Sequence, residues 1–494
     1  MSKVNLTCFS PGFNQILFGR APRTALAQLE GKLGQLRRSS LSELSDVFGE
    51  WVPERYLEPK RSGPNSRRRL FSGNVTFWAF LFQVLSPQTA CREVVRKVQS
   101  YCSMKKLKVA KGSASAYCQA RQRLSLDDLH GIHRAVTARM AGRVITDQLW
   151  KGHDVKVVDG TGITTADTPC LQKRYPQPCG QSPGCGFPVV KLAACFSLAS
   201  GALLHWVESS LGHHDSPLLR RMIAFFKKGD VVLADRGFCS YANIALLVGR
   251  GVEVVMRLHQ KRKSDFRQGR PLGSYDRLIV WKKPQSPIGF SRREWRRLPR
   301  EMPLRVVRIF VSIKGFRSRT VDLVTTFTDP ESYTHSDLAE LYYRRWAVEL
   351  YFRHIKSTMG MEMLRGRSED VVRKEIAMFA IAYNLIRALM QQAAGTYQCD
   401  LSRLSFKAAA DTLRQYQSAL AATRFNPRSQ RCIVDHMIRL IACESVPLRP
   451  FRCEPRVLKR RQKPFQRLTQ PRALMTVSPS RKNKGYYRPK PALS

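Results

Sequence analysis

The sequence is short of acidic residues. Its 494 residues include 37 Asp and Glu against 84 Lys and Arg, which gives a formal net charge of +47 at pH 7. Such an excess opposes compaction unless a polyanion neutralises it, and phosphate backbones do so best because each neutralised phosphate releases counterions. A small acidic metabolite would not require so much charge. The composition therefore predicts nucleic acid as the partner, with an anionic membrane surface as the weaker alternative.

Long apolar runs are also missing. No uninterrupted stretch approaches the roughly 18 residues of a membrane-spanning helix, and the densest one, 77–85, predicts a buried helix. The first residues lack the basic, apolar and small-residue pattern of a secretion signal. We therefore expect no membrane segment and a cytoplasmic location.

Paired cysteines are absent as well. The 13 cysteines are odd in number and scattered, which predicts reduced thiols rather than a disulfide framework. Cys170, Cys179 and Cys185 lie close together, but their gaps of eight and five residues do not match the CxxC spacing of a structural zinc site. We expect no zinc.

The chain has enough hydrophobic residues, 43%, to fill several cores, and its length suggests about three domains. We expect residues 1–145 to form a helical, basic region that binds DNA ends. Within it, Arg121 and Arg123 lie near the start of a helical stretch. We expect them to face a DNA backbone or groove, although a solvated polar face is the alternative.

Residues 150–365 have a different pattern of predicted secondary structure. Short runs rich in β-branched residues alternate with helical segments, which predicts an α/β layer architecture. Asp159 and Asp235 each end one of these runs, and ligands in open α/β sheets gather at strand ends. Residues 259–303 break the alternation, and we expect a β-rich insertion there that contains Trp281 and Trp295.

Helices are predicted again after this core. One long helix is expected over 336–359, and a helical C-terminal region over 366–445 is a candidate for dimerisation. Residues 446–494 form a basic tail that we expect to be disordered in isolation and attracted to phosphate without sequence preference.

The helix predicted over 336–359 carries a polar stripe. Tyr342, Arg345, Glu349 and Lys356 stand at offsets 0, 3, 7 and 14, hence on one face. A buried Glu requires a compensating cation or metal, and Arg345 lies one turn before Glu349. A salt-bridged amphipathic helix is the simpler interpretation of an arbitrary helix, but the two strand-end aspartates favour a functional site.

Three carboxylates, two at strand ends and one on a later helix, suit a pair of Mg²⁺ ions. Hard cations bind oxygen ligands, and Mg²⁺ usually relies on a few carboxylates together with water and substrate phosphate. Two such ions, about 3.5–4 Å apart, can activate the attacking oxygen and stabilise the leaving one during phosphoryl displacement.

Three sequence blocks resemble the signature blocks of bacterial DDE transposases. They are VVDGTG at Asp159, ADRGFCSY at Asp235 (D-x-G-F-x2-Y) and Tyr342-x2-Arg345-x3-Glu349-x6-Lys356. The last block is similar to the YREK signature of the insertion-sequence-four branch in all four residues and all three spacings. The resemblance covers roughly residues 155–360.

The resemblance implies an RNase H-like, mixed-sheet catalytic core over 150–365, interrupted by the β-rich insertion and flanked by helical regions. It implies Mg²⁺-dependent cleavage at transposon ends, followed by strand transfer of the 3′-OH into target DNA. Asp159, Asp235 and Glu349 would be catalytic and would hold two Mg²⁺ ions, for which Mn²⁺ could substitute.

The same resemblance implies the contacts with DNA. Tyr342, Arg345 and Lys356 would bind phosphates near the cleaved end. Trp281 or Trp295 would stack on a flipped base in a hairpin intermediate, the alternative for each being a core tryptophan. The partners would be double-stranded DNA, as terminal inverted repeats and target DNA, and a second copy in a synaptic homodimer. Binding to DNA would associate the protein with the bacterial nucleoid.

The sequence also allows two alternative functions and contains one weaker candidate metal site. A nuclease or recombinase of the same fold would hydrolyse DNA without strand transfer, and a noncatalytic DNA-binding protein would use its carboxylates structurally. His213, His214 and Asp215 suggest a metal cluster, but adjacent histidines on an extended segment point to opposite faces. We interpret them as loop residues near the site.

Overall fold

The computed structural model describes residues 42–58, 69–104, 112–262, 264–285, 289–311, 320–423, 426–447, 468–471 and 474–475. Most of the predicted basic tail, 446–494, therefore lies outside the described residues. Among the helices that are described, none is both long and apolar enough to cross a membrane.

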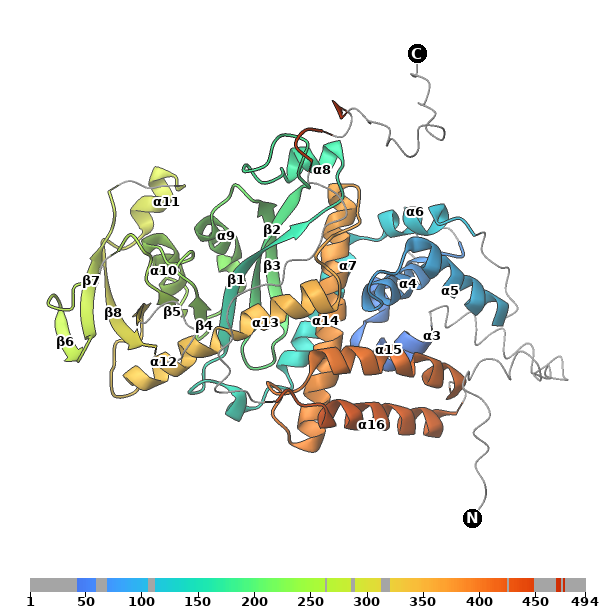
Figure 1. Ribbon diagram of the computed structural model, residues 1–494. Helices are drawn as coiled ribbons and strands as arrows, with labels where there is room; N and C mark the ends of the chain where they lie inside the picture. Colours follow the sequence, from blue (N-terminus) through green and yellow to red (C-terminus); the bar gives the residue numbers. More distant parts are fainter. Residues whose placement is uncertain are drawn as a thin grey trace, which may run out of the picture.

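The strands between Val155 and Arg257 form one half of a nine-stranded mixed sheet (Figure 1). The strands of this half lie in the order β3-β2-β1-β4-β5. Strand β1 pairs antiparallel with β2 and parallel with β4, and β4 pairs parallel with β5. This is the RNase H-like arrangement that the sequence led us to expect. The bounds are β1 Val155–Thr164, β2 Val189–Ser197, β3 Leu203–Ser210, β4 Val231–Ala234 and β5 Glu253–Arg257.

The other half of the sheet continues from β5. Strand β9 (Thr320–Thr325) pairs antiparallel with β5, and β8, β7 and β6 follow in that order. Arg305 on β8 and Asp276 on β7 form a buried, bidentate ion pair with distances of 2.9 and 2.6 Å, so each charge is compensated inside the sheet. The bounds are β6 Arg270–Gly273, β7 Asp276–Lys282, α11 Arg292–Arg297 and β8 Glu301–Phe310. The β-rich insertion predicted from the sequence therefore continues the sheet formed by β1 to β5.

Each face of the sheet has its own core because side chains alternate along every strand. Val157 and Leu233 belong to the core shared with α13 and α14, whereas Val158 and Ala234 belong to the core beneath α9 and α10. The helices that flank the strands are α8 Pro169–Arg174, α9 Asp215–Met222, α10 Tyr241–Val248, α12 His335–Arg344 and α13 Ala347–Arg353.

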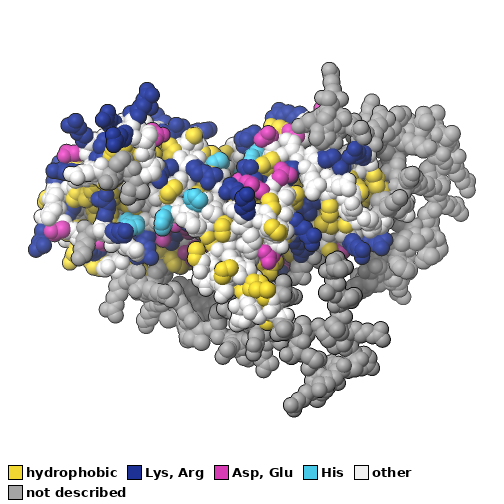
Figure 2. Space-filling model, turned by 90° about the horizontal axis from the view of Figure 1, so that it is seen from above, with side chains coloured by type: hydrophobic (Ala, Val, Ile, Leu, Met, Phe, Trp, Pro, Cys, Tyr) yellow, Lys and Arg dark blue, Asp and Glu magenta, His cyan; other side chains and the backbone are white. Residues whose placement is uncertain are grey.

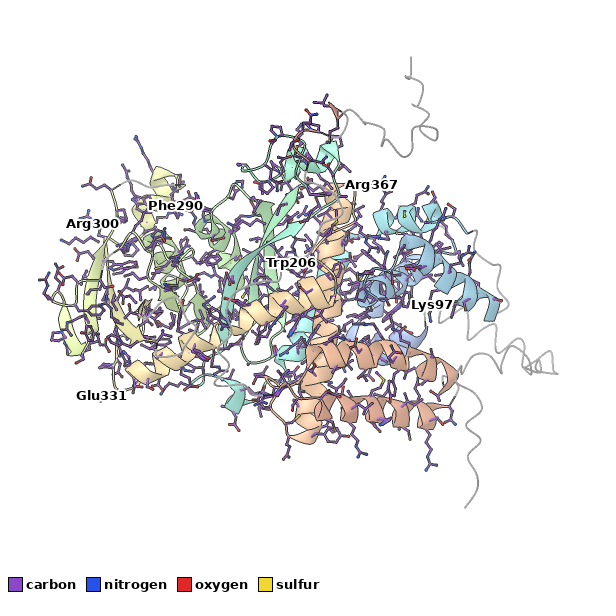
Figure 3. The ribbon with its side chains drawn as sticks, in the orientation of Figure 1. Lys97, Trp206, Phe290, Arg300, Glu331 and Arg367 are labelled. Atoms are coloured by element: carbon purple, nitrogen blue, oxygen red, sulfur yellow. The ribbon has the colours of Figure 1, made fainter. Side chains whose placement is uncertain are left out.

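Helix α14 (Glu369–Tyr397) connects the sheet to the helical regions at both ends of the chain. Figure 1 shows it between the strands and the N-terminal helices, and most of its residues are buried. Near it, the rings of His133 on α7 and Trp206 on β3 lie 4.8 Å apart, and Trp206 is labelled in Figure 3. The remaining helices are α3 Ser42–Phe48, α4 Gly73–Leu85, α5 Cys91–Met104, α6 Ser115–Arg123, α7 Leu126–Ala141, α15 Phe406–Thr423 and α16 Pro427–Cys443.

Short helical turns join several of these elements. Four are 3-10 turns, at Gly49–Trp51, Glu54–Tyr56, Thr146–Gln148 and Ile223–Phe225. A fifth, His354–Thr358, is a π-helical segment that follows α13 directly.

The helix predicted over 336–359 is not continuous. Helix α12 ends at Arg344, and α13 begins at Ala347. Across the break, the amides of Val348 and Glu349 donate to carbonyls only three residues back, so the backbone tightens there. The break lies at Arg345, which belongs to the predicted polar stripe, and at Trp346.

Candidate active site

The two predicted aspartates lie side by side at the end of β4. Val158 of β1 pairs with Ala234 of β4, so Asp159 and Asp235 are the next residues on two neighbouring parallel strands. Because Val158 and Ala234 point toward α9 and α10, the residues after them point to the opposite face. That face is covered by the segment that contains Glu349.

Arg345 joins the third carboxylate to the first. Its guanidinium lies 3.4 Å from Oδ2 of Asp159 and 3.7 Å from Oε1 of Glu349, and its side chain is 8% exposed. The hydroxyl of Tyr342 donates to Oδ1 of Asp235 over 3.4 Å. The three predicted acids therefore surround one guanidinium and its neighbouring phenol, although they come from three separate parts of the sequence.

Negative charge accumulates around Asp159. The pKa of Asp159 is raised to about 6, chiefly by burial and also by the charges of Asp235 and Glu349, while the Gly160 amide and Arg345 act to lower it. Burial raises the pKa of Tyr342 to about 12, so its hydroxyl stays a neutral donor. For Arg345, burial lowers the pKa, but Tyr342 and the three carboxylates outweigh that effect and raise it.

These carboxylates offer the right donors for Mg²⁺. All three supply oxygen, and burial raises the pKa of Asp159, so its ionised form lacks the stabilisation that a bound cation would provide. In the described part of the chain, no three Asp, Glu, His or Cys side chains are already close enough together to hold a metal ion. The guanidinium of Arg345 instead occupies the space between Asp159 and Glu349.

Lys356 lies further along the same edge of β1. Its ammonium donates to Oγ1 of Thr161 over 3.2 Å and to the carbonyl of Gly162 over 3.0 Å. Lys356 belongs to the π-helical segment, in which one extra residue per turn changes the direction of the side chains. All four residues of the predicted stripe thus face the strands that carry the aspartates.

The block around Asp235 has a structural explanation. Phe238 is buried in the core beneath α10, and Ser240 accepts a hydrogen bond from the amide of Asn243 as the N-cap of that helix. Tyr241 donates its hydroxyl to the carbonyl of Pro299 over 2.8 Å. The block therefore attaches the loop after Asp235 both to the core and to the sheet continuation.

Other predicted DNA contacts lie elsewhere. Trp281 on β7 is 6% exposed and is covered by the guanidinium of Arg262, 4.0 Å from its ring. Trp295 on α11 is half-buried beside Phe290, which Figure 3 labels. The structure brings neither indole to the carboxylates.

Arg121 requires a correction. It is 6% exposed, and its guanidinium lies 4.0 Å above the ring of Phe80, inside the N-terminal helices. The sequence suggested that Arg121 and Arg123 lie near the start of a helix, but both lie in the last turn of α6, where Phe80 of α4 covers Arg121. Arg121 is therefore a packing residue in this structure, whereas Arg123 is only partly buried.

Two further residues lie near the site, of which the first was missed from the sequence and the second was named only as a loop residue. Trp346 stands in the helix break and is 43% exposed, with the guanidinium of Arg345 5.6 Å from its ring. Asp215, interpreted from the sequence as a loop residue, is the first residue of α9 and pairs with Lys191. The position of Trp346 directly after Arg345 in the third sequence block could have indicated that it lies near the site. Asp215 was singled out from the sequence only because it follows His213 and His214.

Basic side chains collect at the end of the molecule formed by the sheet continuation. Figure 2 shows Lys and Arg over this end. The exposed arginines on and beside α11 are Arg292, Arg293, Arg296, Arg297 and Arg300. Such a group favours contact with a phosphate backbone.

Comparisons with known proteins agree with this site. Residues 150–385 match the family model described as "Transposase DDE domain". The chain is 24% identical over 356 residues to "Transposase InsG for insertion sequence element IS4" of Escherichia coli (strain K12), covering 72% of this chain and 77% of that protein. It is 25% identical over 252 residues to "Probable transposase for insertion sequence element IS5377" of Geobacillus stearothermophilus, covering 51% and 61%.

A solved structure is also similar. A chain of the "piggyBac transposase synaptic complex with hairpin DNA" matches at a TM-score of 0.39 and 9% identity, covering 81% of this chain and 82% of that chain. The family assignment rests on the matched domain and the insertion-sequence relatives, which agree with the strand order and the grouped carboxylates. Residues 150–385 form a transposase DDE domain, and the chain as a whole is similar to transposases of bacterial insertion sequences, including that of IS4.

Proposed function

We propose that this transposase cuts DNA at the ends of its own insertion sequence and joins the freed 3′-OH to target DNA. Asp159, Asp235 and Glu349 are the proposed catalytic residues. The observation that carries the proposal is the arrangement of these carboxylates around Arg345. Asp235 follows the end of β4 as expected, whereas Asp159 lies within β1, which continues to Thr164, and Glu349 comes from a helix in a distant part of the chain.

The proposed cofactor is a pair of Mg²⁺ ions, with Mn²⁺ as a functional substitute. When bound by the three carboxylates, the ions would supply activation of the attacking oxygen and stabilisation of the leaving one. The chain's own contribution is to hold the acids together. Helix α13 packs against β1, and Arg345 reduces the repulsion between Asp159 and Glu349.

The proposed DNA contacts use the cations beside the carboxylates. Arg345 and Lys356 would bind phosphates near the cleaved end, and Tyr342 would donate its hydroxyl there. Lys356 is positioned by Thr161 and Gly162 on β1, so its charge is fixed close to Asp159. The exposed arginines of α11 would hold the same DNA further from the cut, without reading its sequence.

A base-flipping step belongs to the same proposal. Trp295 is more accessible than Trp281, because Arg262 covers the latter, and either would have to be uncovered to stack on a base. The exposed indole of Trp346 is a third candidate, since it already lies beside Arg345.

The proposed partners are terminal inverted repeats, target DNA and a second copy of the chain. Two ends must be brought together for cut-and-paste transfer, so we expect a synaptic homodimer that acts on DNA of the bacterial nucleoid in the cytoplasm. Helix α14 is mostly buried within its own chain, which leaves α15 and α16 as the candidate dimer surface in the C-terminal region. Light scattering with and without paired ends tests the dimer.

A gel assay distinguishes the candidate functions. Linear DNA that ends in the terminal repeat is incubated with the protein, Mg²⁺ and a supercoiled target plasmid. Joined products support the transposase. Cleavage without joining supports a nuclease, and binding without cleavage supports a noncatalytic DNA-binding protein.

A further inference from the structure

An ion pair behind the catalytic strands has no role in the proposed reaction. Asp215 is the first residue of α9, and its Oδ1 lies 2.8 Å from Nζ of Lys191 on β2. The same ammonium donates to the carbonyl of His213 over 2.8 Å. The two side chains are 18% (Lys191) and 33% (Asp215) exposed, so the pair is largely shielded from solvent. It fastens the start of α9 to the strand beside β1.

The carboxylate of Asp215 lies directly against the two segments that carry the catalytic aspartates. A Cβ built on Gly160 would lie 3.2 Å from Oδ1 of Asp215, and one built on Gly237 would lie 2.8 Å from Oδ2. Gly160 follows Asp159 directly, and Gly237 comes two residues after Asp235.

Close approach, rather than backbone conformation, explains these two glycines. Neither Gly160 nor Gly237 has a positive φ, so an alanine could adopt either backbone conformation. A methyl group at Gly237 would instead collide with the carboxylate, and a methyl group at Gly160 would press against it. The sequence D-G-T at Asp159 and D-R-G at Asp235 therefore leaves room for one acidic side chain between two backbones.

Asp215 approaches from the face opposite to the active site. Gly160 follows Val158 at an interval of two, and Val158 belongs to the core beneath α9 and α10. The side chain of Asp159 points to the other face, toward Arg345. Asp215 therefore touches the main chain that carries the catalytic acids and acts through their position.

A second set of hydrogen bonds fixes α9 to the loop after Asp235. Asn243, which is fully buried on α10, donates to the carbonyl of Phe238 over 2.8 Å and to Oγ of Ser216 over 3.1 Å. Ser216 also donates to Oγ of Ser240 over 3.1 Å. The first turn of α9 is thus tied to the β4 loop by Asn243 and to β2 by Lys191.

We propose that Lys191 and Asp215 are positioning residues that set the separation of the backbones carrying Asp159 and Asp235, and through it the affinity of those carboxylates for divalent ions. The proposal rests on the metal-dependent function proposed above. Residues that orient metal ligands from outside the coordination shell typically change metal affinity by about 10–100-fold when they are removed.

The test measures Mn²⁺ binding by calorimetry on the full chain, beside the Mg²⁺ concentration that gives half-maximal cleavage. We expect Asp215→Ala and Lys191→Met each to weaken Mn²⁺ binding by about tenfold or more and to raise the Mg²⁺ requirement similarly. Lys191→Arg, which keeps the charge, should restore binding to within about threefold of the wild type.

A similarly shielded ion pair elsewhere in the sheet provides the matched control. Arg308 and Asp322 lie 2.7 Å apart on β8 and β9 and are 28% and 21% exposed. Asp322→Ala should lower the melting temperature about as much as Asp215→Ala, with no effect on Mn²⁺ affinity. Equal Mn²⁺ affinity in Asp215→Ala and the wild type, at the same loss of melting temperature, would overturn the positioning role.

A double-mutant cycle covers the case in which Asp215→Ala does not fold. Gly160→Ala should weaken Mn²⁺ binding in the wild-type background, and less so when Asp215 is replaced by the smaller Ser, because the collision is relieved. Additive effects would contradict the contact. A wild type that binds Mn²⁺ but joins no DNA would contradict the proposed function alone, since the coupling between Gly160 and Asp215 would still be measurable.

Discussion

One buried arginine of the N-terminal helices and one beside the grouped carboxylates are exposed to the same small extent, but their surroundings differ. Arg121 and Arg345 are both 6% exposed. Arg121 lies over the ring of Phe80 and donates to Oε1 of Gln83, which is a neutral side chain. Arg345 lies between the carboxylates of Asp159 and Glu349. The surroundings, rather than the burial, separate a packing arginine from a functional one.

The comparison explains why charge alone is a poor guide to DNA contacts in so basic a chain. A guanidinium over an aromatic ring gains packing and cation–π energy and needs no substrate. A guanidinium among three acids holds charges that would otherwise repel, which is useful only if those acids must be close together. Substitutions of the carboxylates, the tryptophans and the two arginines test this distinction.

Removal of one catalytic carboxylate should abolish cleavage. Asp159→Ala, Asp235→Ala and Glu349→Ala are expected to lose Mg²⁺-dependent cutting and to bind the terminal repeat almost as well as the wild type. Gel assays of cleavage and binding measure both. Glu50→Ala is the control, because Glu50 is 83% exposed in the N-terminal region and pairs only with Arg139 among the described residues. Normal cleavage by a variant would remove its residue from the site.

The tryptophans should separate packing from contact in the same way. Trp281→Ala should lower the free energy of unfolding by about 3–5 kcal/mol, because a buried indole is lost. Trp346→Ala should leave stability nearly unchanged and weaken binding to cleaved ends by about tenfold, since one base stack contributes about 1–3 kcal/mol.

Trp295→Ala should fall between these variants, and it alone should stall after nicking if its indole holds a flipped base. Urea unfolding and denaturing gels distinguish the three. Hairpin formation at the wild-type rate by all three variants would exclude base stacking on any of them.

The two arginines should also respond in opposite ways. Arg121→Ala should destabilise the chain by about 2–4 kcal/mol through lost packing on Phe80, with an unchanged salt dependence of DNA binding. Arg345→Ala should change stability less and should reduce the salt slope of binding to cleaved ends, because one phosphate contact is lost. Lys356→Ala should act like Arg345→Ala. An unchanged salt slope in Arg345→Ala would count against its phosphate role.

The pH dependence of the free energy of unfolding should reveal the raised pKa of Asp159. The pKa of Asp159 is about 6, above its ordinary value of 3.8, so its ionised form is disfavoured in the folded chain. This destabilisation is absent below about pH 4, grows as the pH rises, and is complete above about pH 6.

Asp159→Asn should therefore raise the free energy of unfolding by about 2 kcal/mol at pH 8 without metal, and by little at pH 4. Chemical denaturation at the two pH values measures the difference. Mn²⁺ competes with the same proton, so its apparent affinity for the wild type should fall as the pH drops below 6. A pH-independent difference between the two proteins would show that charge is not its cause.

The sequence was sufficient for the parts of this fold that depend on local patterns. The β-branched runs before Asp159 and Asp235 predicted strands of an α/β layer, and the structure pairs these two strands as parallel neighbours. The spacing of Tyr342, Arg345 and Glu349 predicted one polar stripe, and the contacts of the stripe survive the break between α12 and α13.

The remainder depended on contacts through space. The break at Arg345 and the burial of Arg121 under α4 follow from packing that no periodicity encodes. Asp215 gave the weakest sequence signal of all, because its significance lies in two glycines 55 and 22 residues away that have no side chain to show it.

A crystal structure with cleaved-end DNA and Mn²⁺ would test directly whether the three carboxylates bind two metal ions, because anomalous scattering locates the ions. The account predicts two Mn²⁺ peaks, with oxygens of Asp159, Asp235 and Glu349 at about 2.0–2.2 Å from them and the Arg345 guanidinium turned to a DNA phosphate. Peaks ligated by other side chains, or Glu349 outside the coordination of both ions, would contradict it.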